Sequence, residues 1–285
     1  SYLKEIGNEA FKNSGLTSLG IGSVTDIGDY AFSGCKGIND VVLTSATSIG
    51  AGAFENCVAL TTVSAPALET IPEYCFDGCE KLATVSVAAA KLVDEYAFRN
   101  CVKLSKFTGF SAVERINSYA FENTTFSSIS STVLTTLEPY AFKGCWNLTG
   151  ITLNGLKSVD LSMFEGANHL SYFTFNNATE LIFPENGLAS LYPSLKSLKA
   201  SKITELPDYA FDGCVDLTTH SFTELTSVGK YAFRGTALTE INFSKLKTVG
   251  EGAFSKITAA KTVVLPVISS ISTSMFEGCT GVTET

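Results

Sequence analysis

The amino-acid sequence predicts a repeat solenoid of the α/β class, built from about thirteen turns of about 22 residues each. The first observation is a phenylalanine, usually in an Ala-Phe dipeptide, that recurs at spacings of 21 to 23 residues with a single gap of 47. The second is an isoleucine or valine five residues before most of these phenylalanines. The third is an L-x-x-V-x-L triplet that follows them. The recurring phenylalanines are Phe11, Phe32, Phe54, Phe76, Phe98, Phe121, Phe142, Phe164, Phe211, Phe233, Phe254 and Phe276.

One such unit is too short to bury its own apolar side chains, whereas stacked copies bury them against each other. We therefore expect phenylalanine to pack on phenylalanine, and leucine on leucine, along the stack. The last two apolar residues of each triplet alternate with polar ones, as at Val85 and Val87, which predicts one short parallel strand per turn. The gap of 47 residues fits two turns, one of them longer than the rest.

The Tyr-Ala-Phe segment of each unit predicts a short helical or 3-10 turn. Glycine or asparagine lies two residues after the phenylalanine in nearly every unit, and both residue types tolerate a positive φ. A left-handed residue at this position would end the helical turn as a C-cap does. Lys256 occupies the position in one unit, so we expect local strain there.

The repeat extends over residues 1–285, which predicts a single solenoid domain. An irregular long repeat lies at about 176–200, where the usual phenylalanine and cysteine are missing. Both ends of the chain cut a repeat, which indicates a fragment of a longer chain.

The repeat resembles that of a known family. The unit C-x-x-L-x-x-V-x-L followed by I-x-x-x-A-F-x-G-C is similar to the BspA-like (treponemal-type) leucine-rich repeat, and the clearest copies run from Ile71 to Val87 and from Leu137 to Leu153. The resemblance covers nearly the whole chain. It implies a right-handed superhelix in a secreted or surface-attached protein of anaerobic bacteria or some protists, with a role in adhesion to host proteins or other cells. It implies no catalytic residue, because the family shares none.

Composition and charge argue against several classes of function. Lys plus Arg number 20 against 28 Asp plus Glu, a net charge of −8, and an acidic chain repels phosphate backbones, so we expect no nucleic-acid partner. No apolar run approaches the ~18 residues that a membrane helix needs. Nucleophile-elbow, zinc-protease, P-loop and dinucleotide-binding motifs are missing, so we expect no catalytic residue and no cofactor. Two histidines are too few for a histidine-rich metal site.

Seven of the eight cysteines lie three residues after a phenylalanine, so stacking should align them in one column. Neighbours in such a column lie ~4.8 Å apart with parallel Cβ vectors, whereas a disulfide needs Cβ atoms ~3.8 Å apart. The spacing therefore predicts reduced, buried thiols that act as small apolar filler. Cys75 lies four residues before Cys79, and a bridge or metal site at this pair is the less favoured alternative.

His220 and the tyrosines each have two interpretations. His220 lies at an inward position of its triplet, which favours a hydrogen-bonded core histidine over a functional one. A tyrosine precedes the repeat phenylalanine by two residues in many units, which favours a half-buried stacking ladder over a glycan-binding strip. These tyrosines are Tyr30, Tyr74, Tyr96, Tyr119, Tyr140, Tyr209 and Tyr231.

The sequence places its candidate binding site around the seventh to ninth repeats. Trp146 lies where other units have Lys, Val or Glu, and it is predicted to face outward. His169 follows one turn later on the same edge, and Tyr172 replaces the usual Ser or Thr on the strand face. The long repeat adds Phe183 and Tyr192, and irregular loops with exposed aromatics often carry binding. The alternative is that Phe183 is a displaced core residue and that Trp146 covers a packing defect.

These observations favour a non-enzymatic binding or adhesion module that acts outside the cell or at its surface. The expected partner is a host or cell-surface protein or a glycan. The alternative is a structural spacer or stalk that presents another domain away from the surface. Irregular surface columns favour binding and uniform columns favour a spacer, and this sequence has one irregular zone in a mostly uniform surface, so both interpretations stay open.

Overall fold

The computed structural model describes residues 3–283. It groups the chain into two compact units, unit 1 (Ser1–Leu148 with Met163–Ala167) and unit 2 (Thr149–Ser162 with Asn168–Thr285). Each unit is a parallel β-solenoid, and we call one repeat of it a coil. The fold has about 12 coils of about 22 residues, one fewer than the sequence predicts.

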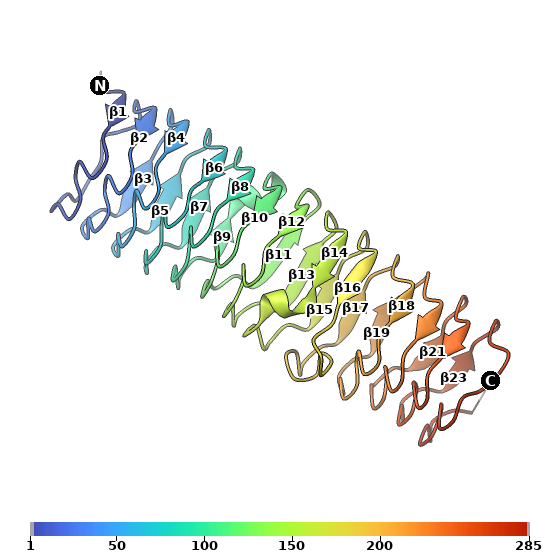
Figure 1. The fold of residues 1–285 in the computed structure, drawn as a ribbon. Helices are drawn as coiled ribbons and strands as arrows, with labels where there is room; N and C mark the ends of the chain where they lie inside the picture. The colour runs from blue at the N-terminus through green and yellow to red at the C-terminus, as the bar shows by residue number, and fades with distance from the viewer. Residues whose placement is uncertain (1–2, 284–285) are drawn as a thin grey trace. The chain divides into compact units, whose positions relative to one another are not determined.

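Most coils contribute two strands, not the single strand that the sequence predicts. The additional strand lies at the Ile or Val five residues before the phenylalanine, where one exposed polar residue precedes one buried apolar residue. This pattern is too short for sequence periodicity to reveal a strand. In unit 1 the additional strands pair in the orders β1-β2-β4 and β6-β8-β10-β12, and the triplet strands pair in the order β3-β5-β7-β9 (Figure 1).

The strands of unit 1 pair in parallel and in register, so equivalent residues of successive repeats lie side by side. They are β1 (Glu5–Ile6), β2 (Asp26–Ile27), β3 (Asp40–Val42), β4 (Ser48–Ile49), β5 (Thr62–Ser64), β6 (Thr70–Ile71), β7 (Thr84–Ser86), β8 (Leu92–Val93), β9 (Lys106–Phe107), β10 (Arg115–Ile116), β11 (Ser128–Ser131) and β12 (Thr136–Leu137).

Unit 2 repeats the arrangement with one longer step. Tyr172 pairs with Ser197, 25 positions further on, so the long repeat of the sequence is one enlarged coil. The strands are β13 (Gly150–Leu153), β14 (Ser158–Asp160), β15 (Tyr172–Thr174), β16 (Glu180–Ile182), β17 (Ser197–Lys199), β18 (Glu205–Leu206), β19 (Thr219–Ser221), β20 (Ser227–Val228), β21 (Glu240–Asn242), β22 (Thr248–Val249) and β23 (Thr262–Val264).

Two interruptions of the additional-strand sheets coincide with prolines. Elsewhere the residue after such a strand donates its N–H to the preceding coil, as Gly50 does to the Ile27 carbonyl at 2.8 Å. Pro72 and Pro207 occupy this position and have no N–H to donate. The pairing accordingly stops between β4 and β6 and between β16 and β18.

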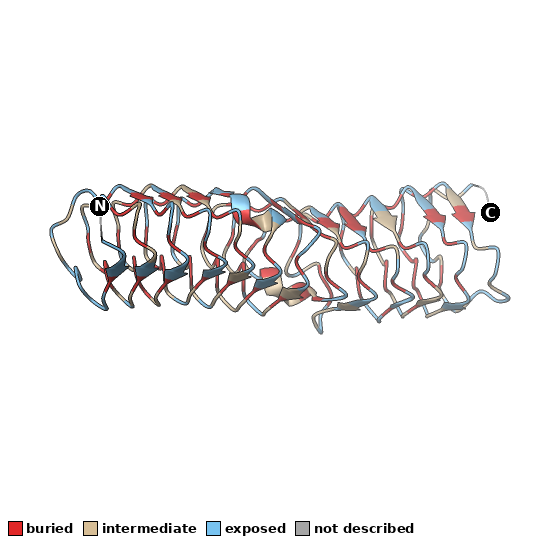
Figure 2. Ribbon diagram, turned by 90° about the horizontal axis from the view of Figure 1, so that it is seen from above, coloured by how far each residue is buried: buried red, intermediate tan, exposed pale blue. Residues whose placement is uncertain are grey.

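Buried and exposed residues alternate along the coils of each unit (Figure 2). The repeat phenylalanines form the centre of this core: the Phe98 ring stacks on Phe76 at 5.3 Å and on Phe121 at 5.2 Å between centroids. All three rings are fully buried. The packing of phenylalanine on phenylalanine is therefore as predicted, and burial of each such side chain contributes about 1.5–3 kcal/mol.

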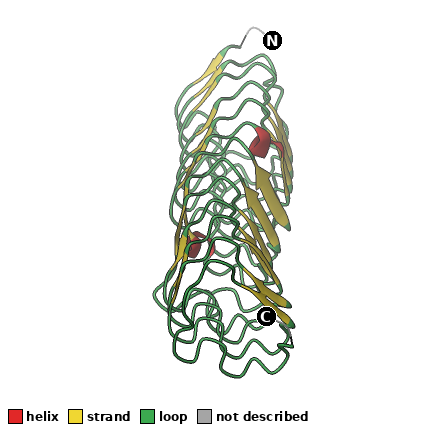
Figure 3. Cartoon of the chain, turned by 90° about the vertical axis from the view of Figure 1, so that its right-hand side faces the viewer, coloured by secondary structure: helices red, strands yellow, loops and turns green. Residues whose placement is uncertain are grey.

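The Tyr-Ala-Phe segments are not helical, which corrects the prediction (Figure 3). Every second N–H group of the segment donates a hydrogen bond to the next coil. The N–H groups of Tyr30, Phe32 and Gly34 donate to carbonyls there at 2.8, 2.8 and 2.7 Å. A helix needs these groups for its own ladder, so the segment forms a series of turns. Within residues 3–283 the helices are two 3-10 helices, at Thr108–Ser111 and Leu161–Phe164.

The predicted left-handed residues two positions after phenylalanine are confirmed. Gly34 has a φ of 71° and Asn56 one of 56°. Lys256 keeps the same conformation with a φ of 59°, so the strain expected at this residue is present in the backbone. A second left-handed position, which the sequence did not indicate, lies two residues before phenylalanine, where Tyr30 has a φ of 53°.

Candidate functional site

The aromatic residues that the sequence singles out divide between the two units. Trp146 lies in unit 1 and its side chain is 56% exposed. His169 and Tyr172 lie in unit 2, His169 in an exposed turn and Tyr172 on β15 with 52% exposure. Trp146 and Tyr172 thus offer exposed aromatic surface, each within its own unit.

Tyr192 does not belong to a binding surface, which corrects the prediction. Its side chain is fully buried, its hydroxyl donates to the Leu161 carbonyl, and its ring meets Phe173 edge-on at 5.1 Å. Phe183 is half-buried and meets Phe211 edge-on at 5.6 Å, which fits the alternative of a displaced core residue. The enlarged coil therefore uses its aromatic residues largely for packing.

The most extensive aromatic surface in unit 1 is a stack of four tyrosines, Tyr74, Tyr96, Tyr119 and Tyr140, which we call the tyrosine column. Successive ring centroids lie 5.0, 5.2 and 5.2 Å apart, with interplanar angles of 20° or less. Tyr140 is 37% exposed and the other three are half-buried. The sequence indicated this column, and the structure agrees with its interpretation as a half-buried ladder.

Two cations lie against the tyrosine column. The guanidinium carbon of Arg99 lies 5.5 Å from the Tyr74 ring centroid and 4.6 Å from that of Tyr96, which are cation–π distances. The ammonium of Lys143 lies 5.3 Å from the Tyr140 centroid. The column thus combines phenol groups with positive charge along one edge of the coils.

A bidentate ion pair holds Arg99 in place. Its Nε donates to Oδ1 of Asp77 at 3.1 Å and its Nη2 to Oδ2 at 2.5 Å. The hydrogen bond to Asp77 raises the pKa of Arg99, and burial raises the pKa of the Tyr74 phenol. Sequence reasoning missed this pair, although Asp77 and Arg99 occupy the residue after phenylalanine in successive repeats and carry opposite charges.

The cysteine column is reduced, as predicted. All eight cysteines are free, and burial raises the pKa of the Cys57 thiol to about 12 and that of Cys79 well above its usual value. Their role extends beyond apolar filler, because the thiols donate to carbonyls of the preceding coil, as Cys79 Sγ does to Phe54 O at 3.2 Å. Such raised pKa values leave the thiols protonated and unreactive.

His220 faces the interior from β19, but the hydrogen-bond partner predicted for it is missing. Its Nδ1 is buried without a hydrogen-bond partner. The ring stacks on Phe243 at 4.6 Å and on Phe222 at 5.4 Å, and burial lowers the pKa of the imidazole to about 4. The three rings lie at a crevice of about 270 Å³ between β19 and β21.

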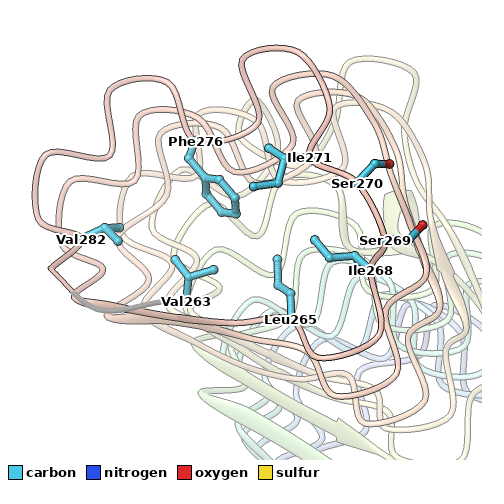
Figure 4. Close-up of a pocket in the computed structure, with 8 residues that line it drawn as sticks. All are labelled: Val263, Leu265, Ile268, Ser269, Ser270, Ile271, Phe276 and Val282. Carbon is cyan, nitrogen blue, oxygen red and sulfur yellow. The ribbon is translucent and has the colours of Figure 1, made fainter.

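An apolar pocket of about 560 Å³ lies in the coil that contains Phe276. Figure 4 shows Phe276, Ile271 and Leu265 with their side chains directed into it. Ile271 is 70% exposed, whereas Ile71, its equivalent within unit 1, is fully buried beneath its neighbouring coil. The pocket is therefore the core face of one coil that no described residue covers.

None of the helices in the described part of the chain has the length and apolar character needed to span a bilayer. Likewise, residues 3–283 contain no group of three or more His, Cys, Asp and Glu side chains placed to hold a metal ion.

The repeat pattern and the fold both match known proteins. The sequence matches the family described as BspA type Leucine rich repeat region, in six copies over residues 4–127, 88–186 and 189–285. Among solved structures it is similar to a leucine-rich repeat protein from Bacteroides ovatus, with 24% identity, 98% of this chain and 68% of that chain covered, and a TM-score of 0.54. It is also similar to a leucine rich cell surface protein from Faecalibacterium prausnitzii, with 22% identity, 99% and 82% covered, and a TM-score of 0.50. No curated protein matches the sequence.

Proposed function

Since this chain belongs to the BspA-type leucine-rich repeat family, we propose that it is a non-enzymatic binding module that recognises a protein partner through the tyrosine column of unit 1. Repeat solenoids of this kind are typical non-enzymatic scaffolds, and leucine-rich repeat domains generally bind proteins. A rigid stack of coils presents one extended row of side chains, which suits a partner of macromolecular size.

The observation that carries the proposal is the stacked, partly exposed tyrosine column with Arg99 and Lys143 against it. Tyrosine and arginine are the residues that dominate the energetics of protein interfaces. They are also rigid in this arrangement, because stacking fixes the rings and Asp77 fixes the guanidinium. A partner that binds here orders few additional side chains, which favours affinity.

Backbone conformation supports a role for these tyrosines beyond the fold. Tyr96 and Tyr119 have φ values of 57° and 59°, a left-handed conformation that costs roughly 1–2 kcal/mol for a residue with a Cβ. Gly52 occupies the same repeat position at a φ of 58° and fits the coil without that cost. Ring stacking offsets part of the strain, at about 0.5–1.5 kcal/mol per pair.

The geometry of the column favours a protein over a glycan. Sugars bind aromatic side chains by lying on a ring face, but the inner faces of these rings are covered by the neighbouring tyrosines at 5.0 to 5.2 Å. The column instead presents ring edges and phenol oxygens. Such a surface fits side chains that donate hydrogen bonds, and the exposed Glu73 and Glu95 beside it offer further acceptors.

We infer that the module acts at the cell surface or outside the cell. This rests on the family, whose members are typically surface proteins. Six buried thiols between Cys57 and Cys214 have strongly raised pKa values. Such inert thiols resist oxidation, which suits a protein outside the cell.

The proposal is tested with the double variant Tyr96→Gly/Tyr119→Gly. Glycine removes the rings yet suits the left-handed backbone, as Gly52 shows, so the fold should be retained. Binding of the parent and the variant is measured on panels of immobilised extracellular proteins and of glycans. We expect the parent to bind at least one protein and the variant to lose about tenfold or more in affinity.

The matched control is Tyr209→Gly/Tyr231→Gly in unit 2, where the two rings stack at 5.7 Å. This variant makes the same chemical change at the same repeat position outside the tyrosine column. Equal losses in both variants would attribute the effect to the solenoid and not to the column. A parent that binds glycans alone, or a column variant that binds like the parent, would contradict the proposal, and a parent that binds nothing on either panel would leave the spacer interpretation in its place.

A further inference from the structure

The pairing of triplet strands in unit 2 stops at one place that contains no proline. The N–H of Thr218 donates to the Lys196 carbonyl at 3.0 Å, and that of Lys261 donates to the Thr239 carbonyl at 3.1 Å. No corresponding bond in the described chain joins Thr239 to Thr218, and β19 and β21 belong to different sheets. Backbone donors and acceptors along this seam therefore lack their usual partners in the neighbouring coil.

The seam opens on one face only. On the other strand of the same coils, Ser227 pairs with Thr248 and Val228 with Val249, and the core rings of Phe233 and Phe254 remain stacked at 5.7 Å. The step from β19 to β21 is 21 residues, and so is the step from β20 to β22, which remain paired, so the seam involves one strand of each coil only. The result is a crevice and not a broken solenoid.

The crevice has an aromatic floor and a polar rim. His220, Phe222 and Phe243 form the floor, and both phenylalanines are buried. The rim consists of hydroxyl, amide and carboxylate groups. They belong to Ser221, Thr223, Glu240, Asn242 and Ser244.

The buried Nδ1 of His220 makes the empty crevice costly. This atom is buried without a hydrogen-bond partner, and a buried polar atom in that state destabilises the fold. The equivalent residue of the preceding strand is Leu198, which has no such cost. Because His220 lines the crevice, a hydroxyl group of a bound ligand lies close to the imidazole ring.

The charge and the volume of the crevice restrict which ligands it can bind. Glu240 is the one formally charged side chain that lines the crevice, so an anion is repelled there. A volume of about 270 Å³ lies below the range of about 300–1,000 Å³ typical of sites for drug-sized molecules. Hydroxyl, amide and imidazole groups around an apolar floor match a compact molecule that has many hydroxyl groups and some apolar surface.

We propose that the crevice between β19 and β21 is a binding site for a single neutral sugar residue, held by His220, Asn242 and Glu240 over the floor of Phe222 and Phe243. The site lies in unit 2 and shares no residue with the tyrosine column. Its success or failure is therefore independent of the protein-binding function proposed for unit 1.

The test follows the imidazole nitrogens of the whole chain by NMR during titration with glucose, galactose, mannose and N-acetylglucosamine. A ligand of this size should bind with an affinity of about millimolar. We expect at least one sugar to shift the His220 resonances in a saturable way while those of the exposed His169 stay unchanged. His220→Leu, which copies Leu198, should abolish binding, and His169→Leu should leave it intact.

Two further measurements make the proposal falsifiable even if His220→Leu alters the seam. Methylamine probes the alternative of an ammonium ligand, and Glu240→Gln keeps hydrogen bonding while removing the charge. A neutral sugar should bind the Glu240→Gln variant within a few-fold of the parent. The proposal is overturned if no sugar moves the His220 resonances of the parent, or if methylamine alone moves them and loses its effect in Glu240→Gln.

Discussion

Unit 1 and unit 2 bury their apolar side chains with the same kind of repeat, but the repeat is more regular in unit 1. In unit 1 one phenylalanine per coil stacks in parallel from Phe11 to Phe142, at 5.1 to 5.7 Å between centroids. Both units add further rings beside this column: Phe107, Phe110 and Phe126 in unit 1, and His220, Phe222 and Phe243 in unit 2. The two units differ in the spacing of their triplet strands, whose steps are all 22 residues within unit 1 and between 21 and 25 residues within unit 2. The constant step accompanies an unbroken column of corner rings, whereas the 25-residue step lies where the corner phenylalanine is missing.

The largest effect is expected from removing a ring at the centre of the regular column. Phe98→Ala should lower the free energy of unfolding by about 3–5 kcal/mol, because the side chain is fully buried between two stacked rings. Phe11→Ala, at a ring that is 38% exposed, should cost clearly less. Chemical denaturation measures both, and hydrogen exchange should place the damage of Phe98→Ala within unit 1, as nearest-neighbour coupling requires. Similar melting of Phe98→Ala and the parent would contradict the central position of this ring.

The seam of unit 2 should be sensitive to acid. The pKa of His220 is about 4 in the folded chain against 6.5 when unfolded, so between these values the unfolded chain takes up a proton that the folded chain refuses. The stability lost as pH falls from 6.5 to 4 should reach about 1–3 kcal/mol, and no loss is expected above pH 6.5.

The measurement compares unfolding free energies of the parent and His220→Leu at neutral pH and near pH 4.5. The leucine variant should lose this part of the acid sensitivity. Leu198→His provides the reverse control, because it introduces a second buried imidazole in the adjacent coil. Identical pH profiles for the parent and His220→Leu would show that His220 does not resist protonation.

A smaller effect is expected at the left-handed position after phenylalanine. The equivalent positions of unit 1 hold glycine or asparagine, whereas Lys256 in unit 2 has a φ of 59° with a full side chain. Lys256→Gly should raise the free energy of unfolding by up to about 1 kcal/mol. Lys247→Gly, whose residue has no positive φ, should instead destabilise the chain slightly. Thermal melting of both variants checks the sign, and a destabilised Lys256→Gly would argue against strain at this residue.

The smallest effect is expected for the chemical reactivity of the cysteine thiols, and its measurement leaves the fold unchanged. Cys279 is the least buried thiol, whereas the cysteines of unit 1 are all buried. Thiol titration of the native chain should therefore modify Cys279 first and the others slowly, with all eight reacting after denaturation. Peptide mass spectrometry identifies the order of labelling, and early modification of Cys79 or Cys101 would show that the unit 1 column opens more readily than its packing indicates.

Periodicity was enough to predict the features that recur in every coil. The stacked phenylalanines, the reduced cysteines and the left-handed Gly or Asn all follow from one residue type at one repeat position. In the repeat that contains Phe121, Thr124 occupies the cysteine position, and its hydroxyl donates to the Phe121 carbonyl at 2.9 Å. Features that depend on a partner one coil away, such as the Asp77–Arg99 pair, require the register to be known first.

Other features escaped prediction for identifiable physical reasons. Tyr192 lies in the coil with a 25-residue step, where the repeat no longer assigns a residue to the inside or the outside. The strand at Ile27 comprises two residues, which is too few for an alternating pattern. The unpaired Nδ1 of His220 depends on the break between β19 and β21, and nothing in the local sequence around His220 marks that break.

The hydrogen bonds between coils also set how the chain responds to force. They link residues about one repeat apart, as in the 21 positions between Thr25 and Lys4 or the 25 between Cys101 and Phe76. A coil pulled from the end of a unit therefore separates from one neighbour without disturbing the coil beyond it. Each such event releases about 22 residues, which extend to about 75 Å of chain. Under tension a unit would lengthen in a series of similar steps, and each step would dissipate mechanical work.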